Sequence, residues 1–281
     1  GDGTFTDVSE AAGLWEGEAG HGMGVVFTDL DGDHLQDIYV ANDASPNLAY
    51  RNEGDGTFTD VSEVSGLAMG DVGVPQSGMG LAVGDCDGDG TDEIFVANYS
   101  HQPYALYHHS GFGMYDDWAP LAGIAEPTFA TLGWGSTFLD VDLDGDLDLY
   151  VANGHVYPQV DEVDPTTSYH QRDYLFLNNG GGGFDLHRPA AGSALAEVGS
   201  TRGVVRVDID NDGDWDLLVN GLESRPRLLV NRTERAGGFL GVELEGVTSP
   251  RQPAGARVAV VGGPGPAETL RLGSSYMSSE D

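Results

Sequence analysis

The sequence predicts an all-β fold, a β-propeller built from four-stranded blades. Three observations support this prediction: an acidic phrase that recurs four times, short β-branched and aromatic runs on both sides of each copy, and 43 glycines among 281 residues. Repeats of this size are typical of propellers, and abundant glycine is typical of a chain with many turns. No long amphipathic helical pattern interrupts the repeats. The predicted propeller therefore has at least four blades.

The acidic phrase defines the repeat. Its four copies, named loops one to four, are DLDGDHLQD at 29–37, DCDGDGTDE at 85–93, DVDLDGDLD at 140–148 and DIDNDGDWD at 208–216. The longer interval before loop four indicates an insertion in the third unit, which we place at 155–173. A unit of about 55 residues has room for the four short strands of one blade.

Each unit contains short runs that favour strands. An apolar run precedes each acidic phrase (VVFT, LAVG, STFL and VVRV), and another follows it (IYVAN, IFVAN, LYVAN and LLVN). Third strands are expected at 47–52, 104–109, 174–179 and 227–232. The phrase GTFTDVS at 56–62, with weaker echoes at 111–119 and 180–186, supplies a fourth strand. β-Branched and aromatic residues bounded by Gly and Asp favour strands over helices.

Charge limits the possible partners. The formal net charge is −34, and all 12 basic residues are arginine. A field this negative repels nucleic acid and anionic membrane surfaces, and attracts hard divalent cations. No apolar run is long enough for a membrane span. The lone Cys86 can close no disulfide within the chain and suits a small buried filler.

Carboxylates alternate along every loop. Numbering nine positions per loop, positions 1, 3, 5 and 9 are acidic in all four copies, and the carbonyl of position 7 can add a ligand. An oxygen-only shell of this kind suits Ca²⁺, so up to four ions are expected. The carboxylate ligands are Asp29, Asp31, Asp33, Asp37, Asp85, Asp87, Asp89, Glu93, Asp140, Asp142, Asp144, Asp148, Asp208, Asp210, Asp212 and Asp216; the position-7 residues are Leu35, Thr91, Asp146 and Asp214.

Two other interpretations of the loops are weaker. An EF-hand needs a glutamate at position 12, whereas position 12 is valine in every copy. Ordinary Asp-Gly turns would explain one loop, but not four copies with an acidic residue at every ligand position. Loops three and four are predicted to bind most tightly, because they combine glycine at position 6 with an extra aspartate at position 7. Loop one has His34 at position 6, where a left-handed turn is expected.

Other polar residues were weighed against structural roles. His21, Ser77, Trp134 and Arg202 precede the first strand of each unit and could form a ligand rim, although tight glycine packing is the favoured explanation for these segments. The adjacent His108 and His109 could bind a metal, but neighbouring strand residues point to opposite faces, which favours a surface hairpin. No motif of a known catalytic class is present, so no enzymatic activity is expected.

The loops and their flanks resemble a known family. The pattern D-x-D-x-D-G-x-x-D between two short strands is similar to the FG-GAP/VCBS repeat of integrin-α-type β-propellers. The stretch YRNEGDGTFTDVSEVSGL (50–67), followed by GMGLAVGDCDGDG (78–90), resembles the version found with ASPIC/UnbV domains, as in the cartilage acidic protein family. The stretches at 239–263 and 271–281 resemble the first half or more of an ASPIC/UnbV domain.

The resemblance implies two regions: a propeller at 1–235 and a shortened ASPIC/UnbV-like β segment at 236–281. It implies Ca²⁺ in the loops, a secreted or cell-surface location (extracellular or periplasmic), and a role in adhesion or in binding a protein or glycan ligand. Such propellers have about seven blades. Either the four units belong to a larger ring, or a smaller ring closes with residues 3–9 pairing into the last blade. The alternative function is a secreted carbohydrate-active or other enzyme with its site on the propeller face.

Overall fold

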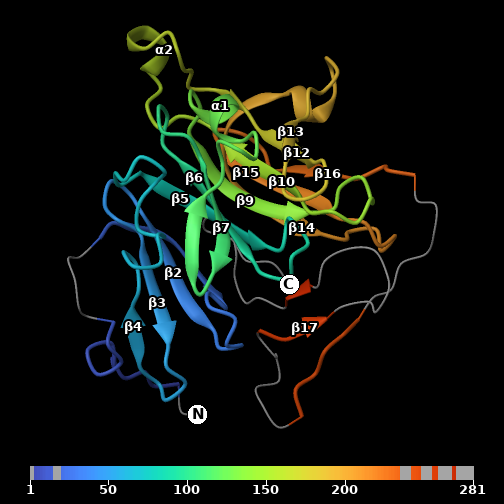
Figure 1. The fold of residues 1–281 in the computed structure, drawn as a ribbon. Helices are drawn as coiled ribbons and strands as arrows, with labels where there is room; N and C mark the ends of the chain where they lie inside the picture. The colour runs from blue at the N-terminus through green and yellow to red at the C-terminus, as the bar shows by residue number, and fades with distance from the viewer. Residues whose placement is uncertain (1–2, 15–19, 235–241, 248–254, 259–267, 270–281) are drawn as a thin grey trace.

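The computed structural model describes residues 3–14, 20–234, 242–247, 255–258 and 268–269. Its dominant feature is a series of four four-stranded antiparallel sheets, which we name blades one to four (Figure 1). The all-β prediction and the blade prediction are confirmed.

The first three blades have the predicted strand order. Each runs outward from its innermost strand, and the GTFTDVS phrase or one of its echoes forms the outermost strand. Blade one contains β1 (Gly22–Thr28), β2 (Asp37–Asn42), β3 (Leu48–Asn52) and β4 (Phe58–Asp60). Blade two contains β5 (Gly78–Gly84), β6 (Glu93–Asn98), β7 (Ala105–Gly111) and β8 (Met114–Asp117). Blade three contains β9 (Gly133–Leu139), β10 (Asp148–Asn153), β12 (Tyr174–Asn178) and β13 (Phe184–Leu186).

Blade four departs from this order. It contains β14 (Val198–Val207), β15 (Asp216–Leu222), β16 (Arg227–Leu229) and β11 (Gln171–Arg172), in the order β11-β14-β15-β16. β14 has ten residues, and its first two extend far enough to pair with β11 from the predicted insertion. The insertion therefore supplies the fourth strand on the inner side.

Residues 3–9 form no strand in the structure, so they do not pair into the last blade as the smaller-ring alternative required. The segment that follows them lies against blade one, where the amide of Phe58 donates to the carbonyl of Ala12 (2.8 Å). The same link recurs at the next two blades, from Tyr115 to Ser65 (2.7 Å) and from Phe184 to Ala122 (2.8 Å). The segments that precede blades one, two and three are thus each hydrogen-bonded to the outermost strand of the blade that follows.

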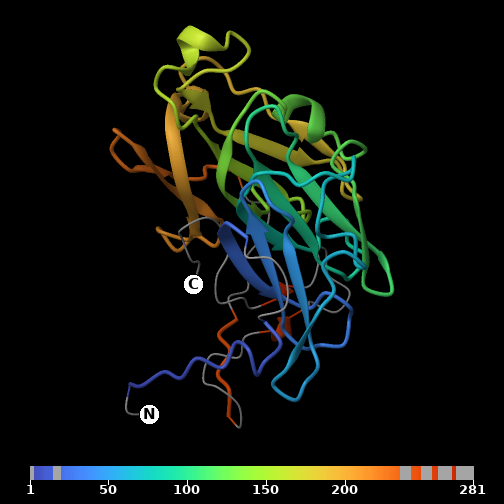
Figure 2. The same ribbon diagram turned by 90° about the vertical axis from the view of Figure 1, so that its left-hand side faces the viewer.

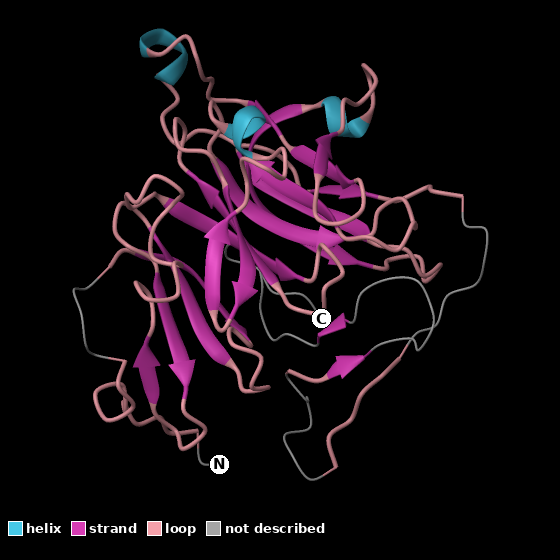
Figure 3. Ribbon diagram, in the orientation of Figure 1, coloured by secondary structure: helices cyan, strands magenta, loops and turns pink. Residues whose placement is uncertain are grey.

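The remaining elements are small. The short helices α1 (Ala125–Thr128), α2 (Val160–Val163) and η1 (Ala194–Ala196) lie at one end of the blades (Figure 3). Most of the predicted C-terminal segment 236–281 lies outside the described residues. Its described part includes a pair of two-residue strands, β17 (Arg257–Val258) and β18 (Glu268–Thr269).

The hydrophobic core lies between successive blades. The innermost strands β1, β5, β9 and β14 follow one another in space, and the sheets pack face to face (Figure 2). Three apolar clusters fill the interfaces, represented by Val26 with Leu81, by Phe95 with Phe138, and by Tyr150 with Val204. β5 and β9 are buried at every residue, because each has a blade on both sides.

Glycine allows the innermost strands to approach closely. A Cβ atom added to Gly80 would lie 1.8 Å from the carbonyl oxygen of Trp134, and one added to Gly24 would lie 2.7 Å from that of Met79. Any side chain at Gly80 would therefore collide with the backbone of the neighbouring blade. Backbone packing thus accounts for the glycines of these segments.

Candidate metal centres in the blade loops

The four acidic loops share one backbone conformation. Positions 4 and 6 are both left-handed in every loop, although the residues differ. The pairs are Gly32 (φ 83°) and His34 (φ 69°), Gly88 (78°) and Gly90 (93°), Leu143 (65°) and Gly145 (100°), and Asn211 (59°) and Gly213 (85°). The left-handed turn predicted at position 6 is confirmed, including at His34. The turn at position 4 was missed, because leucine gives no signal for a conformation that disfavours side chains.

The aspartate at position 1 stabilises these turns. Its two oxygens accept hydrogen bonds from backbone amides of the same loop, at 2.8 and 2.9 Å in loop one and at 3.1 and 3.0 Å in loop three. Loops two and four repeat the arrangement. Each carboxylate oxygen keeps a further lone pair that can face a cation. Position 1 therefore shapes the loop and still offers a ligand.

The aspartate at position 9 closes the loop against the third strand of its blade. The Asp37 carboxylate accepts from the amides of Leu30 (2.7 Å) and Asn52 (2.6 Å). Asp148 and Asp216 bind the equivalent amides in loops three and four, at distances between 2.8 and 3.0 Å. All three side chains are buried, with exposed fractions of 0 to 1%. Sequence reasoning treated position 9 only as a ligand and missed this anchoring role.

The structure brings three carboxylates together in each loop. Within each group, one oxygen per residue lies within 4.8 Å of the others. The groups are Asp29, Asp31 and Asp33; Asp85, Asp87 and Asp89; Asp140, Asp142 and Asp148; and Asp208, Asp210 and Asp212. A further group joins Asp87 and Glu93 to His108. Positions 1 and 3 thus converge in all four loops, whereas position 9 joins the carboxylate group only in loop three.

Position 7 is held close to position 5. In each loop its amide donates to the position-5 carboxylate, at 2.8 Å from Leu35 and 3.0 Å from Asp146, and likewise from Thr91 (2.8 Å) and Asp214 (3.2 Å). The contribution of the position-7 carbonyl to a metal shell stays a prediction.

Burial makes these carboxyl groups difficult to ionise in the absence of a cation. Loss of solvent, together with the neighbouring loop carboxylates, raises the pKa of Asp37 to about 6, of Asp148 to about 7 and of Glu93 to about 8. A bound cation would favour the ionised form and lower the pKa. The electrostatics of the loops are those of a site that a divalent ion would stabilise.

Each of loops one to three is also tied to the next blade through its position-2 carbonyl. The Leu30 carbonyl accepts a hydrogen bond from the Tyr115 hydroxyl (3.2 Å). The Cys86 carbonyl accepts from the side-chain amide of Asn178 (2.7 Å), and the Val141 carbonyl from the side-chain amide of Asn231 (2.9 Å). Sequence reasoning missed these residues. A signal was present in the asparagines that end the third-strand phrases NLAYRN, YLFLNN and RLLVN. Ordering a loop therefore also orders the contact between two blades.

Part of the predicted ligand rim is occupied by internal contacts. The Arg202 guanidinium lies 4.3 Å from the ring centroid of Trp134 and donates to the carbonyls of Gly154 (3.1 Å) and His155 (3.0 Å). Trp134 donates its indole N–H to Gly154 (2.7 Å). Ser77 is 8% exposed. Trp134 and Arg202 therefore hold blades three and four together.

A serine and a histidine meet near this contact. Ser100 Oγ lies 3.3 Å from His155 Nε2, and both side chains are buried. His155 Nδ1 accepts a hydrogen bond from the Tyr157 amide (3.1 Å). In neutral histidine, the proton is then on Nε2, which donates to the serine. A histidine in this tautomer cannot remove the serine proton, so the pair lacks the arrangement of a nucleophile and its base.

Comparison with known proteins agrees with the repeat. A family model described as an FG-GAP-like repeat matches residues 29–96 and 85–151, which span loops one to three. The chain carries FG-GAP-like repeats. Cartilage acidic protein 1 is 28% identical over 220 residues in both Mus musculus and Homo sapiens, covering 78% of this chain and 31% and 30% of those proteins. The Xenopus tropicalis protein is 25% identical over 207 residues. The chain thus spans about a third of the length of these relatives.

Two solved structures are similar to the chain at a low level. One is an Agrocybe aegerita lectin described as recognising non-reducing terminal N-acetylglucosamine, with 19% identity, a TM-score of 0.38, and coverage of 73% of this chain and 51% of the lectin. The other is the Photorhabdus luminescens Tc holotoxin pore, with 18% identity, a TM-score of 0.36, and coverage of 72% and 8%. Among the described residues, no helix has the length and apolar character needed to cross a membrane.

Proposed function

We propose that the chain is a calcium-binding β-propeller module, with one Ca²⁺ held in each of the four blade loops. The observation that carries this proposal is the convergence of three carboxylates in every loop, repeated on the same left-handed turns. Clustered like charges raise the free energy of the folded chain unless a cation offsets them. Oxygen ligands in a flexible loop suit Ca²⁺ better than ions that prefer nitrogen or sulfur.

We further propose that the module binds a protein or glycan partner outside the cell and has no catalytic role. A dissociation constant of roughly 10⁻⁴–10⁻³ M, as extracellular Ca²⁺ modules have, would require an extracellular Ca²⁺ concentration to fill the loops. One observation supports the absence of a catalytic role. The Ser100–His155 pair has the wrong tautomer for nucleophilic catalysis, and the neighbouring Arg202 donates to backbone carbonyls. Calcium would then keep the blades in register and so present a fixed binding surface.

The test is a calorimetric Ca²⁺ titration of the chain after its divalent ions have been removed with a chelating resin. The proposal predicts about four equivalents for the unchanged chain, with affinities in the extracellular range. A variant in which the position-3 aspartates of all four groups, Asp31, Asp87, Asp142 and Asp210, are changed to alanine should lose most of this binding. Circular dichroism would confirm that the variant remains folded.

The matched control is Asp55→Ala. Asp55 also precedes a left-handed glycine and accepts hydrogen bonds from the amide (3.0 Å) and hydroxyl (2.6 Å) of Thr57, but among the described residues it joins no cluster of carboxylates. This variant should bind as much Ca²⁺ as the unchanged chain. Absence of binding in the unchanged chain, or equal losses in the two variants, would contradict the proposal.

A further inference from the structure

Loop two differs from the other loops at position 9. Glu93 is fully buried, and its Oε2 accepts from the Cys86 amide (2.9 Å), as the aspartates at position 9 accept from their position-2 amides. Its second oxygen, Oε1, has no hydrogen-bond partner. In the other three loops, the second carboxylate oxygen accepts from the backbone amide of an asparagine at or just after the end of the third strand. His109 occupies that asparagine position in blade two. Glu93 thus offers a buried carboxylate oxygen that the protein itself does not satisfy.

The neighbouring third strand places a histidine beside this oxygen. Strand register fixes the comparison, because Tyr107 pairs with Ile94 in blade two as Tyr50 pairs with Ile38 in blade one. The residue after Tyr107 is His108, and the residue after Tyr50 is Arg51. The equivalent positions in blades three and four are Leu177 and Val230. A metal-binding side chain at this position is therefore specific to blade two.

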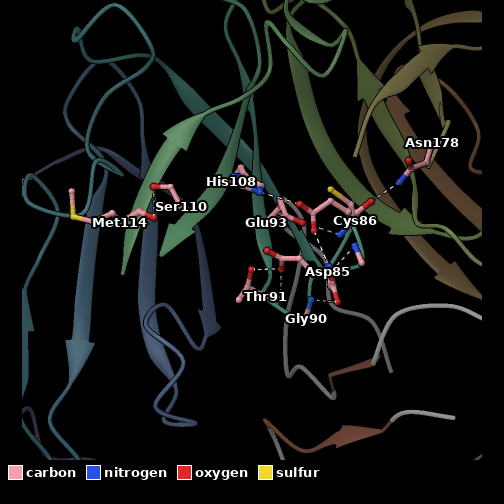
Figure 4. A network of polar contacts seen from close by, with 12 residues as sticks. Asp85, Cys86, Gly90, Thr91, Glu93, His108, Ser110, Met114 and Asn178 are labelled. Atoms are coloured by element: carbon pink, nitrogen blue, oxygen red, sulfur yellow. Dashed lines mark hydrogen bonds and ion pairs between the residues drawn. The ribbon is translucent and has the colours of Figure 1, made fainter. Parts of the chain in front are cut away.

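His108, Asp87 and Glu93 form a compact set of possible ligands. Figure 4 shows His108 and Glu93 close together in this set. The His108 Nε2 lies 2.9 Å from Asp87 Oδ2, and one donor atom from each of the three residues lies within 4.8 Å of the others. The His108 ring packs at 4.7 Å from the Trp118 ring. The histidine and aspartate side chains are 26% and 11% exposed, so the site is sheltered but open to solvent on one side.

We propose that His108, Asp87 and Glu93 bind a first-row transition-metal dication of the zinc class. Imidazole and carboxylate groups both bind Zn²⁺, three ligands leave a fourth coordination position open, and Ca²⁺ prefers oxygen ligands to imidazole. The metal would take the Nε2 lone pair of neutral His108 in place of the hydrogen bond to Asp87. It would also pair with the unsatisfied Glu93 oxygen. Asp87 also belongs to the carboxylate group of loop two, so Zn²⁺ and Ca²⁺ compete for it.

The test is a Zn²⁺ titration of the tag-free chain in millimolar Ca²⁺, followed by calorimetry. The proposal predicts about one equivalent of Zn²⁺ that millimolar Ca²⁺ does not displace. His108→Ala should weaken this binding by at least about tenfold, because loss of an outer-shell partner alone costs 10–100-fold. Glu93→Gln, which keeps the side-chain volume, should also weaken it. His109→Ala is the matched control, since the adjacent His109 is absent from the ligand set and should leave Zn²⁺ binding unchanged.

Several outcomes would overturn this proposal. They are absence of Zn²⁺ binding in the unchanged chain, equal binding by folded His108→Ala, or equal losses in His108→Ala and His109→Ala. Failure of Zn²⁺ binding is distinguishable from failure of the calcium proposal, because Ca²⁺ binding by loops one, three and four does not involve His108. If His108→Ala unfolds, the Glu93→Gln titration decides the same question.

Discussion

Loops one and three have the same backbone turns built from different residues. Loop one places glycine at position 4 and His34 at position 6, whereas loop three places Leu143 at position 4 and glycine at position 6. Their carboxylate groups also differ, because loop one gathers positions 1, 3 and 5 and loop three gathers positions 1, 3 and 9. The shared conformation therefore follows from the aspartate at position 1 and its two amide partners, and glycine only lowers its cost. The ligand set depends on the other acidic residues.

Loops one and three are alike at position 9, where Asp37 and Asp148 each accept two backbone hydrogen bonds. Asp148→Ala should cause the largest destabilisation, because it leaves the buried amide of Asn178 and the partly buried amide of Val141 without acceptors. Each unsatisfied buried group costs about 1–3 kcal/mol, so a loss of up to about 6 kcal/mol is expected with or without Ca²⁺. Asp37→Ala should cost a similar amount in loop one.

Urea denaturation would measure both losses. Asp148→Asn is the matched control, since its carbonyl oxygen can still accept one of the two amides and the expected cost is smaller. A loss seen only in Ca²⁺ would show that position 9 acts as a ligand alone.

The pH dependence of stability separates the calcium-free loops from the occupied ones. The folded-state pKa values of about 6 for Asp37, about 7 for Asp148 and about 8 for Glu93 exceed the ordinary values of 3.8 for aspartate and 4.5 for glutamate. The folded chain therefore binds more protons than the unfolded chain between these limits. The stability that these groups contribute is fully present below about pH 4 and is lost as the pH rises through 6 to 8.

Denaturation in calcium-free buffer at about pH 5.5 and about pH 8 would show this as lower stability at the higher pH. Saturating Ca²⁺ should reduce or reverse the difference, because the ion favours the ionised carboxylates. Equal stability at both pH values without Ca²⁺ would contradict the account of the buried carboxyls.

Loops one and three should also differ in their calcium affinity. Asp142→Ala should lower the melting temperature in Ca²⁺ more than Asp31→Ala, and Asp210→Ala should behave like Asp142→Ala, because position 3 belongs to the carboxylate group of every loop. Loop three carries Gly145 at position 6 and an extra charge from Asp146, and both features favour binding. At millimolar Ca²⁺ each site contributes only about 0.4–1.4 kcal/mol, so the effect is modest.

Thermal melts of these variants should converge when Ca²⁺ is removed. Equal or reversed effects in Ca²⁺ would show that blade packing, and not loop sequence, sets the order of affinity.

The smallest expected effect tests the turn at His34. His34 is left-handed (φ 69°) and its side chain is 83% exposed, so His34→Gly removes backbone strain without removing a buried contact. We expect a gain of up to about 1 kcal/mol, since the greater freedom of glycine in the unfolded chain offsets part of the relief. Gly145→Ala is the reciprocal change in loop three and should destabilise the chain. A loss on His34→Gly would show that histidine supplies a contact of its own.

Much of the fold followed from the sequence, because repeats report directly on blades. The strands around each acidic phrase and the left-handed position 6 were predicted from residue types alone. The pairing of β11 with β14 was not, because two residues within an insertion carry no strand signal. The roles of Asn178 and Asn231 also depend on contacts between blades, which one repeat cannot reveal. The anchoring role of Asp148 was hidden because a buried acceptor and a metal ligand are the same residue type.

Thermal unfolding of the unchanged chain at neutral pH, with millimolar Ca²⁺ and with excess EGTA, tests the central claim most directly. Four occupied loops, each tied to its blade and three of them to the next blade, should together add about 2–6 kcal/mol and raise the melting temperature by several degrees. A single cooperative transition that shifts upward in Ca²⁺ is the predicted result. An unchanged midpoint would contradict the claim that the loops bind Ca²⁺ and thereby stabilise the propeller.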